Sequence, residues 1–155
     1  MHSRSLREFE RDLVNGIVGE LRNLVVIYRS QKGPDMEYYP RIEQVIDSFG
    51  NSSEGTEEVE TGLRLKVGDT VQFECRGWDP QDRTLLWDLF GGLYATTPLG
   101  TAEGSAVSLT LTITEQMVRE KLTIVIWMKS SGKYHRHTNN DDFCAFRYTV
   151  VPPGE

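Results

Sequence analysis

A histidine pair followed by acidic residues is the part of the sequence that comes nearest to a reactive site. His135 and His137 would project to the same side of an extended chain, and Asp141, Asp142 and Cys144 follow closely. Imidazole, carboxylate and thiolate groups together can ligate a transition metal. A structural zinc site normally takes two short chelating pairs, and this stretch supplies one. We therefore interpret it as a polar loop and expect no metal and no other cofactor.

The two thiols are the other candidates for chemistry. Cys75 and Cys144 each lie in an alternating apolar run, which predicts that their side chains point inward. A reactive thiolate needs solvent and nearby positive charge, and neither is expected there. The sequence contains no Gly-x-Ser-x-Gly elbow and no phosphate-binding glycine loop. We expect no catalytic residues and a protein that is not an enzyme, with a metal-dependent enzyme left open as an alternative.

Charge and hydropathy narrow the classes of partner. The chain has 155 residues and a net charge of −6, whereas nucleic-acid binding needs a positive footprint. Its apolar runs, such as Leu24-Val-Val-Ile27, are far shorter than the roughly 20 residues that span a bilayer. Acidic residues from Glu8 onward interrupt any signal-peptide core. We expect no nucleic acid, no membrane span and a cytoplasmic location.

The first segment is predicted to be an amphipathic helix. Ser5-Leu-Arg-Glu8 fits a capping box, and Gly33-Pro34 is a stop signal. Apolar residues recur between them at steps of three and four: Leu6, Phe9, Leu13, Ile17, Leu21 and Leu24. An apolar stripe of this width needs a surface to cover it. That surface could belong to the same chain, to a second copy, to another protein or to a membrane, and the sequence leaves these alternatives open. The acidic residues of the segment oppose an anionic lipid surface: Glu8, Glu10, Asp12 and Glu20.

A second, shorter helix is predicted within residues 40–49, where Ile42, Val45, Ile46 and Phe49 have helical spacing. Residues 51–60 are polar and acidic, and they are interpreted as a mobile linker. The expected organisation is therefore an N-terminal helical segment (1–50), an acidic linker (51–60) and a β-domain (61–153).

From Leu63 onward the hydrophobic period changes from 3.6 to 2, and about seven short runs alternate between apolar and polar residues. In one run Phe73 and Cys75 share a face, and in the next Trp87 and Leu89 share a face. A small inward residue opposite an inward tryptophan is typical of the core of a two-sheet sandwich. The sequence predicts a mainly β protein in which Trp87 is buried between two layers.

These runs also carry a family resemblance over about residues 60–153. Val67-Gly-Asp-Thr-Val71, followed by Phe73 and Cys75, resembles the start of an immunoglobulin-like domain. Trp87-Asp-Leu-Phe-Gly-Gly92 is similar to the Trp-Asp-Phe-Gly-Asp-Gly stretch of polycystic-kidney-disease-type (PKD) domains. The resemblance implies an immunoglobulin-like antiparallel β-sandwich of seven to eight strands. Cys144 falls on the final strand and not on the penultimate one, so we expect two buried thiols in place of the disulfide of typical immunoglobulin domains.

The function expected from these observations is a non-catalytic protein-interaction module, an adaptor or sensor. It would recruit a protein or self-associate through the N-terminal helix, as part of a bacterial multi-protein or defence assembly. The loops near residues 79–83 and 130–142 are further candidates for contact with a partner. The expected interaction residues are Leu6, Phe9, Leu13, Ile17, Leu21, Leu24, Tyr38, Tyr39, Trp78 and Trp127. The alternative is a carbohydrate- or small-ligand-binding sandwich, with Trp78, Trp127 and Tyr94 as its aromatic platform.

Overall fold

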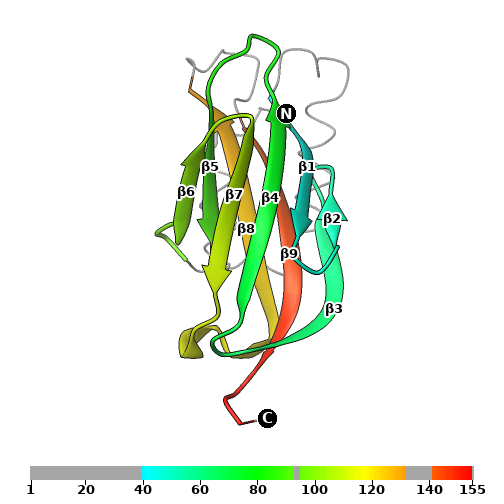
Figure 1. The fold of residues 1–155 in the computed structure, drawn as a ribbon, viewed down its shortest axis with the longest axis vertical. Coiled ribbons are helices and arrows are strands. Elements are labelled where there is room, and N and C mark those ends of the chain that lie inside the picture. Colours follow the sequence, from blue (N-terminus) through cyan, green and yellow to red (C-terminus); the bar gives the residue numbers. More distant parts are fainter. Residues whose placement is uncertain (1–39, 93–94, 132–140, 155) are drawn as a thin grey trace, which may run out of the picture.

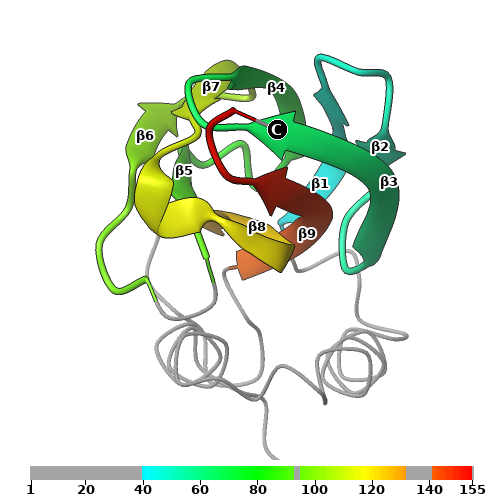
Figure 2. The same ribbon diagram turned by 90° about the horizontal axis from the view of Figure 1, so that it is seen from below.

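Two β-sheets lie face to face in a computed structural model that describes residues 40–92, 95–131 and 141–154 (Figures 1 and 2). The first sheet has the strand order β2-β1-β4-β7, and the second has the order β3-β9-β8-β5-β6. The first sheet consists of β1 (Arg41–Asp47), β2 (Ser52–Ser53), β4 (Thr70–Trp78) and β7 (Ala106–Thr112). The second consists of β3 (Glu58–Lys66), β5 (Leu85–Phe90), β6 (Gly100–Glu103), β8 (Arg119–Ser130) and β9 (Asp141–Val151). A 3-10 turn, η3 (Glu115–Met117), precedes β8. The prediction of a mainly β sandwich is confirmed.

Strand pairing is antiparallel throughout the described sheets, with one exception. β3 runs parallel to β9 along the edge of the second sheet. Because β2 and β4 belong to the first sheet and β3 to the second, the chain passes from the first sheet to the second between β2 and β3, and it returns between β3 and β4. Such crossings tie the two layers together, because neither sheet is built from one continuous stretch of chain.

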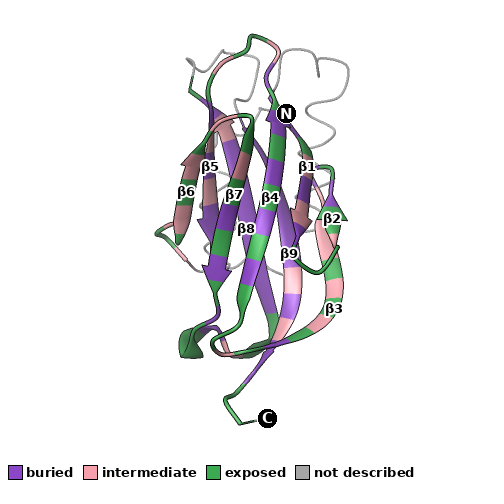
Figure 3. Ribbon diagram, viewed as in Figure 1, coloured by how far each residue is buried: buried purple, intermediate pink, exposed green. Residues whose placement is uncertain are grey.

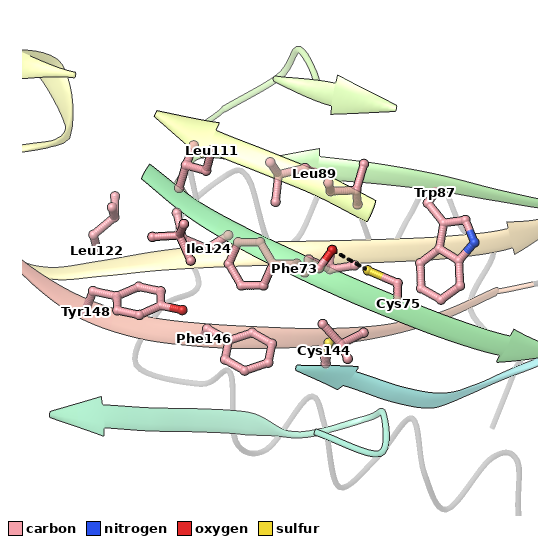
Figure 4. Close-up of a cluster of buried hydrophobic side chains, with 14 of the residues drawn as sticks. Phe73, Cys75, Trp87, Leu89, Leu111, Leu122, Ile124, Cys144, Phe146 and Tyr148 are labelled. Carbon is pink, nitrogen blue, oxygen red and sulfur yellow. Dashed lines mark hydrogen bonds between the residues drawn. The ribbon is translucent and has the colours of Figure 1, made fainter. Parts of the chain in front are cut away.

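The core between the sheets follows from the alternation of the strands. Along β4 every second residue is buried, including Phe73 and Cys75. Trp87 on β5 is fully buried, and its indole Nε1 donates a 2.8 Å hydrogen bond to the carbonyl oxygen of Gly104. The Phe73 ring packs against that of Phe146 on β9, with 5.4 Å between centroids (Figure 4). The predicted burial of a tryptophan between two layers is confirmed, and Figure 3 shows the same alternation along β4.

Gly77 makes room for this tryptophan. A Cβ atom at position 77 would lie 2.9 Å from a ring carbon of Trp87 and 2.5 Å from the sulfur of Met128. Both distances are shorter than a van der Waals contact, so any side chain at position 77 would displace the core. The packing of Trp87 and Met128 against the end of β4 therefore requires a glycine at position 77.

The helix predicted within residues 40–49 is wrong, because residues 41–47 form β1 at the side of β4. A β-bulge explains the misleading pattern. The register between β1 and β4 shifts between Ile42 and Gln44, so Ile42 and Val45 both face the core although they are three residues apart. One extra residue in a strand thus gives the spacing that is otherwise typical of a helix.

The interpretation of residues 51–60 as a mobile linker is also wrong. This stretch contains β2 and the start of β3, and the backbone N–H of Thr56 donates to the carbonyl oxygen of Phe143 at 2.6 Å. The acidic Glu58 and Glu60 both pair with Arg147 of β9. The acidic run therefore has a charge partner in the sheet, and the sandwich begins at residue 41 and not at 61. The helix predicted over the first thirty residues lies outside the described residues.

Candidate functional site

One end of the sandwich carries an exposed aromatic side chain on a rigid strand. Trp78 is the last residue of β4, and 37% of its surface is exposed. Its partner in the strand register is Arg41 of β1, whose guanidinium carbon lies 4.7 Å from the centroid of the indole ring. A cation over the face of an indole ring is attracted by the ring quadrupole. The two strands thus hold this tryptophan in one orientation.

The loop that follows Trp78 is held by a buried carboxylate. Asp79 accepts hydrogen bonds from the backbone N–H groups of Gln81 (2.9 Å) and Arg83 (3.0 Å), and from Nε of Arg83 (3.0 Å). Burial alone would raise the pKa of Asp79, but these donors and the charge of Arg83 outweigh it and lower the pKa. The carboxylate stays ionised near neutral pH, so its hydrogen bonds and its ion pair constrain the loop from Asp79 to Arg83 beside Trp78.

A hollow of about 480 Å³ opens between this loop and the turn that connects β6 with β7. Trp78, Pro80, Arg83, Thr84 and Ser105 are among the residues that line it. The lining joins one aromatic face to hydroxyl groups and to a charged pair. Such a hollow can bind an apolar or amphipathic side chain of a partner, while polar groups at the rim form hydrogen bonds with the polar groups of that partner.

The structure places the described start of the loop region 130–142 beside the end of the loop region 79–83. Ser130, at the end of β8, is the register partner of Leu85, at the start of β5. The backbone N–H of Ser131 donates to the carbonyl oxygen of Thr84 at 2.8 Å. Residues 132–140, including His135 and His137, lie outside the described residues.

The prediction of Trp127 as an exposed contact residue is wrong. Its side chain points away from the core, as the alternation of β8 predicts, yet only 2% of its surface is exposed. Its ring stacks on that of Phe143, with 5.9 Å between centroids. Trp127 is therefore unavailable to an aromatic platform with Trp78. The other predicted interaction residues, Leu6, Phe9, Leu13, Ile17, Leu21, Leu24, Tyr38 and Tyr39, lie outside the described residues, as does Tyr94.

The groups considered for metal binding point in different directions where they are described. Asp142 accepts hydrogen bonds from the backbone N–H of Ile42 (2.8 Å) and from the hydroxyl of Thr56 (2.7 Å). Cys144 is buried in the core (Figure 4). Within the described part of the chain, no group of three or more histidine, cysteine, aspartate or glutamate residues could hold a metal ion.

Both thiols are free and buried between the sheets. Burial raises the pKa of the Cys75 thiol to about 12, with a smaller contribution from the charge of Glu74. Burial raises the pKa of Cys144 as well, and the neighbouring Cys75 adds to this effect. The thiolate form that reacts with electrophiles is therefore suppressed at neutral pH.

We expect neither thiol to react with Ellman's reagent at pH 8 in the native protein, and both to react once the chain is unfolded in guanidinium chloride. The measurement is the amount of coloured thionitrobenzoate released per chain, followed by its absorbance, before and after denaturation. A small exposed thiol such as glutathione, at the same concentration, controls for reagent activity. Rapid release of one equivalent from the folded protein would contradict the burial of these side chains.

The arrangement defines an immunoglobulin-like β-sandwich: two packed, mostly antiparallel sheets with Cys75 and Trp87 together in the core. Comparison of the sequence with protein-family profiles and with curated proteins gives no match. Within the described residues, no helix has the length and apolar character needed to cross a bilayer.

Solved structures with similar folds include the PKD domain of a peptidase from a Thermoplasmatales archaeon, with 11% identity, a TM-score of 0.42, and coverage of 73% of this chain and 93% of that chain. A chain from a structure of T cell specificity and activation by the bacterial superantigen toxic shock syndrome toxin-1 has 14% identity and a TM-score of 0.40, covering 69% of this chain and 98% of that chain. A chain from a complex of titin with the immunoglobulin domain of obscurin-like 1 has 14% identity and a TM-score of 0.38, covering 74% and 100%. At these identities and TM-scores the likeness carries no argument about the function of this chain.

Proposed function

We propose that this chain is a non-catalytic protein-interaction module, and that the end of the sandwich around Trp78 is its contact surface. The observation that carries the proposal is the exposed indole of Trp78, fixed by Arg41 at the edge of a hollow of about 480 Å³. Tryptophan is over-represented in interface hot spots, because it offers a large contact area with few rotatable bonds. An indole that is already oriented loses little conformational entropy on binding.

The surroundings of Trp78 favour a protein partner. Arg41, Asp79, Asp82 and Arg83 place charges of both signs around the indole. An apolar centre with a polar rim is the usual anatomy of a protein–protein interface. The carbohydrate alternative loses one of its predicted platform residues, because Trp127 is buried.

The finer form of the proposal is an adaptor or sensor that recruits a protein or self-associates through residues 5–30, within a bacterial multi-protein or defence assembly. It is supported by the apolar stripe of that segment alone. If the molar mass of the full chain in solution is that of a monomer at all concentrations, the chain does not self-associate and this part of the proposal is contradicted.

The proposed contact surface can be tested by photo-cross-linking in cells that express the full chain. A photoreactive phenylalanine at position 78 should capture a defined partner. The matched control is position 49, because Phe49 is also an exposed aromatic (48%) and follows the opposite end of β1 from Arg41. Equal capture at both positions would contradict the assignment.

With the captured protein purified, Trp78→Ala should raise the dissociation constant about 30-fold or more, which corresponds to ~2 kcal/mol of a hot-spot contact. Phe49→Ala should leave affinity unchanged. The measurement is isothermal titration calorimetry of the full chain. Unchanged affinity of Trp78→Ala would show that the partner binds elsewhere.

A further inference from the structure

The second sheet is buried on both of its faces in the middle of β8 and β9. The core covers one face, where residues such as Ile124 and Ile126 point. Val125 and Trp127 point to the opposite face, and they are nevertheless buried. Their register partners on β9 are Ala145 and Phe143, which are buried as well. We call these four residues the outer patch.

No described element covers the outer patch. The four-stranded sheet lies on the other side of β8 and β9, against the core. In Figure 2 no coloured element lies beyond β8 and β9 on the side away from β4 and β7. Since the exposed fractions refer to a single chain, a second copy does not account for the burial.

Charged residues border the outer patch on both sides. On β3, Glu58 is paired with Ala145 in register and forms an ion pair with Arg147. On β5, Asp88 is the register partner of Trp127 and is half-buried, as is Lys129 at the end of β8. An apolar centre with a charged border is the anatomy of a protein contact and not of a solvated sheet face.

We propose that residues 5–30 of the same chain lie across the outer patch, with their apolar stripe against Trp127 and Phe143. Two of the other segments outside the described part do not fit this role. Residues 132–140 are polar, with two histidines and two asparagines, and residues 93–94 number only two. The stripe from Leu6 to Leu24 supplies the apolar side chains that such a face requires.

The position at which the chain enters the sandwich supports residues 5–30 as the segment that covers the outer patch. Ile42, near the start of β1, donates its backbone N–H to Asp142 at 2.8 Å, and Asp142 adjoins Phe143 of the outer patch. Residues 31–39 could span up to about 30 Å when extended, whereas stacked sheets lie only about 10 Å apart. The connection is therefore long enough to pass from the first sheet to the outer side of the second.

The lengths of the two surfaces also match. A helix over residues 5–30 would be about 39 Å long, and the twelve residues of β8 extend over about 40 Å. Gly16 and Gly19 interrupt the side chains of the segment, and Ala145 is small on the opposing face. Close approach of the two backbones is possible at such positions.

Docking of residues 5–30 on the outer patch limits which surfaces of the chain are free to bind a partner. A segment held on its own sandwich is not a free recruiting arm, so the end around Trp78 remains as the surface for a partner. This placement excludes recruitment through residues 5–30, whereas the proposed contact surface around Trp78 uses other residues and can fail separately.

The first test measures the accessibility of Trp127 in full-chain variants. In a Trp78→Phe background the remaining tryptophans are Trp127 and the core residue Trp87. Ile17→Asp, on the apolar stripe, should make one of these two tryptophans quenchable by acrylamide and shift its emission to the red. Asn15→Asp adds the same charge on the other side of the helix and should change neither. Protection of Trp127 in both variants, with the fold intact by circular dichroism, would overturn the proposal.

The second test decides the matter if Ile17→Asp unfolds the protein. A photoreactive residue at Lys129, at the border of the outer patch, should form cross-links within one chain to residues 5–30. The matched control is Gln72, which is exposed on β4 of the other sheet and should give no such cross-links. Cross-links from position 129 to residues 5–30 of a second chain, or to residues 132–140 alone, would overturn a seat within the same chain.

Discussion

Replacing Trp87 by alanine is expected to lower the free energy of unfolding by about 3–5 kcal/mol, or to prevent folding. Trp87 is the largest fully buried side chain of the core, and it packs against Gly77, which carries no side chain of its own. Its removal would leave a cavity that the rigid strands on either side cannot close. It would also leave the carbonyl oxygen of Gly104 without its indole donor. Since domains are stable by about 5–15 kcal/mol, this single change would use much of the total.

The measurement is urea unfolding followed by circular dichroism, compared with Trp78→Ala. That variant removes the same side chain from a surface position, where 37% of it is exposed, and is expected to cost about 1 kcal/mol or less. Equal loss of stability in the two variants would show that Trp87 does not form the centre of the core. Gly77→Ala should destabilise the protein as well, because its new methyl group would press on the Trp87 ring.

Replacing Asp47 by alanine is expected to lower the free energy of unfolding by about 3 kcal/mol, through the loss of charged hydrogen bonds and the unpaired donors left behind. The Asp47 carboxylate is buried at the end of β1 and accepts four hydrogen bonds. Three come from Phe49 and Asn51 in the turn to β2. The fourth comes from the hydroxyl of Tyr148 at 2.7 Å, on β9 of the other sheet.

Two variants calibrate this result. Tyr148→Phe removes one of the four donors and is expected to cost about 1–2 kcal/mol. Asp69→Ala removes an exposed carboxylate that accepts a 2.8 Å bond from the backbone N–H of Lys66, and should cost about 1 kcal/mol or less. Chemical denaturation at pH 7 measures all three. If Asp47→Ala were no worse than Asp69→Ala, the carboxylate would not be a link between the two sheets.

The strands of the second half could be predicted from the sequence because their alternation is local. Phe73, Cys75, Trp87 and Leu89 repeat at a period of two, and that period needs no knowledge of the rest of the chain. The strand β1 could not be predicted in the same way. Its bulge between Ile42 and Gln44 places Ile42 and Val45 on one face, and only pairing with β4 reveals the bulge.

The candidate site was predictable in part. The exposure of Trp78 follows from its position at the end of an alternating strand, and the structure confirms it. Its partner Arg41 was missed, because the two residues belong to strands far apart in the sequence. Gly77 lies against the Trp87 ring, and Asp79 forms an ion pair with Arg83. The sequence contains both residues, but these contacts are visible only in the tertiary structure.

The sequence by itself determined which side chains of the sandwich share a face, since the direction of a side chain in a strand depends on its position alone. The tertiary structure decided what each face meets. Trp127 points outward as its position requires, yet it is buried. Asp47 bonds with Tyr148 across 101 residues of chain. Contacts of this kind depend on how distant strands are arranged in space, and local periodicity carries no record of that arrangement.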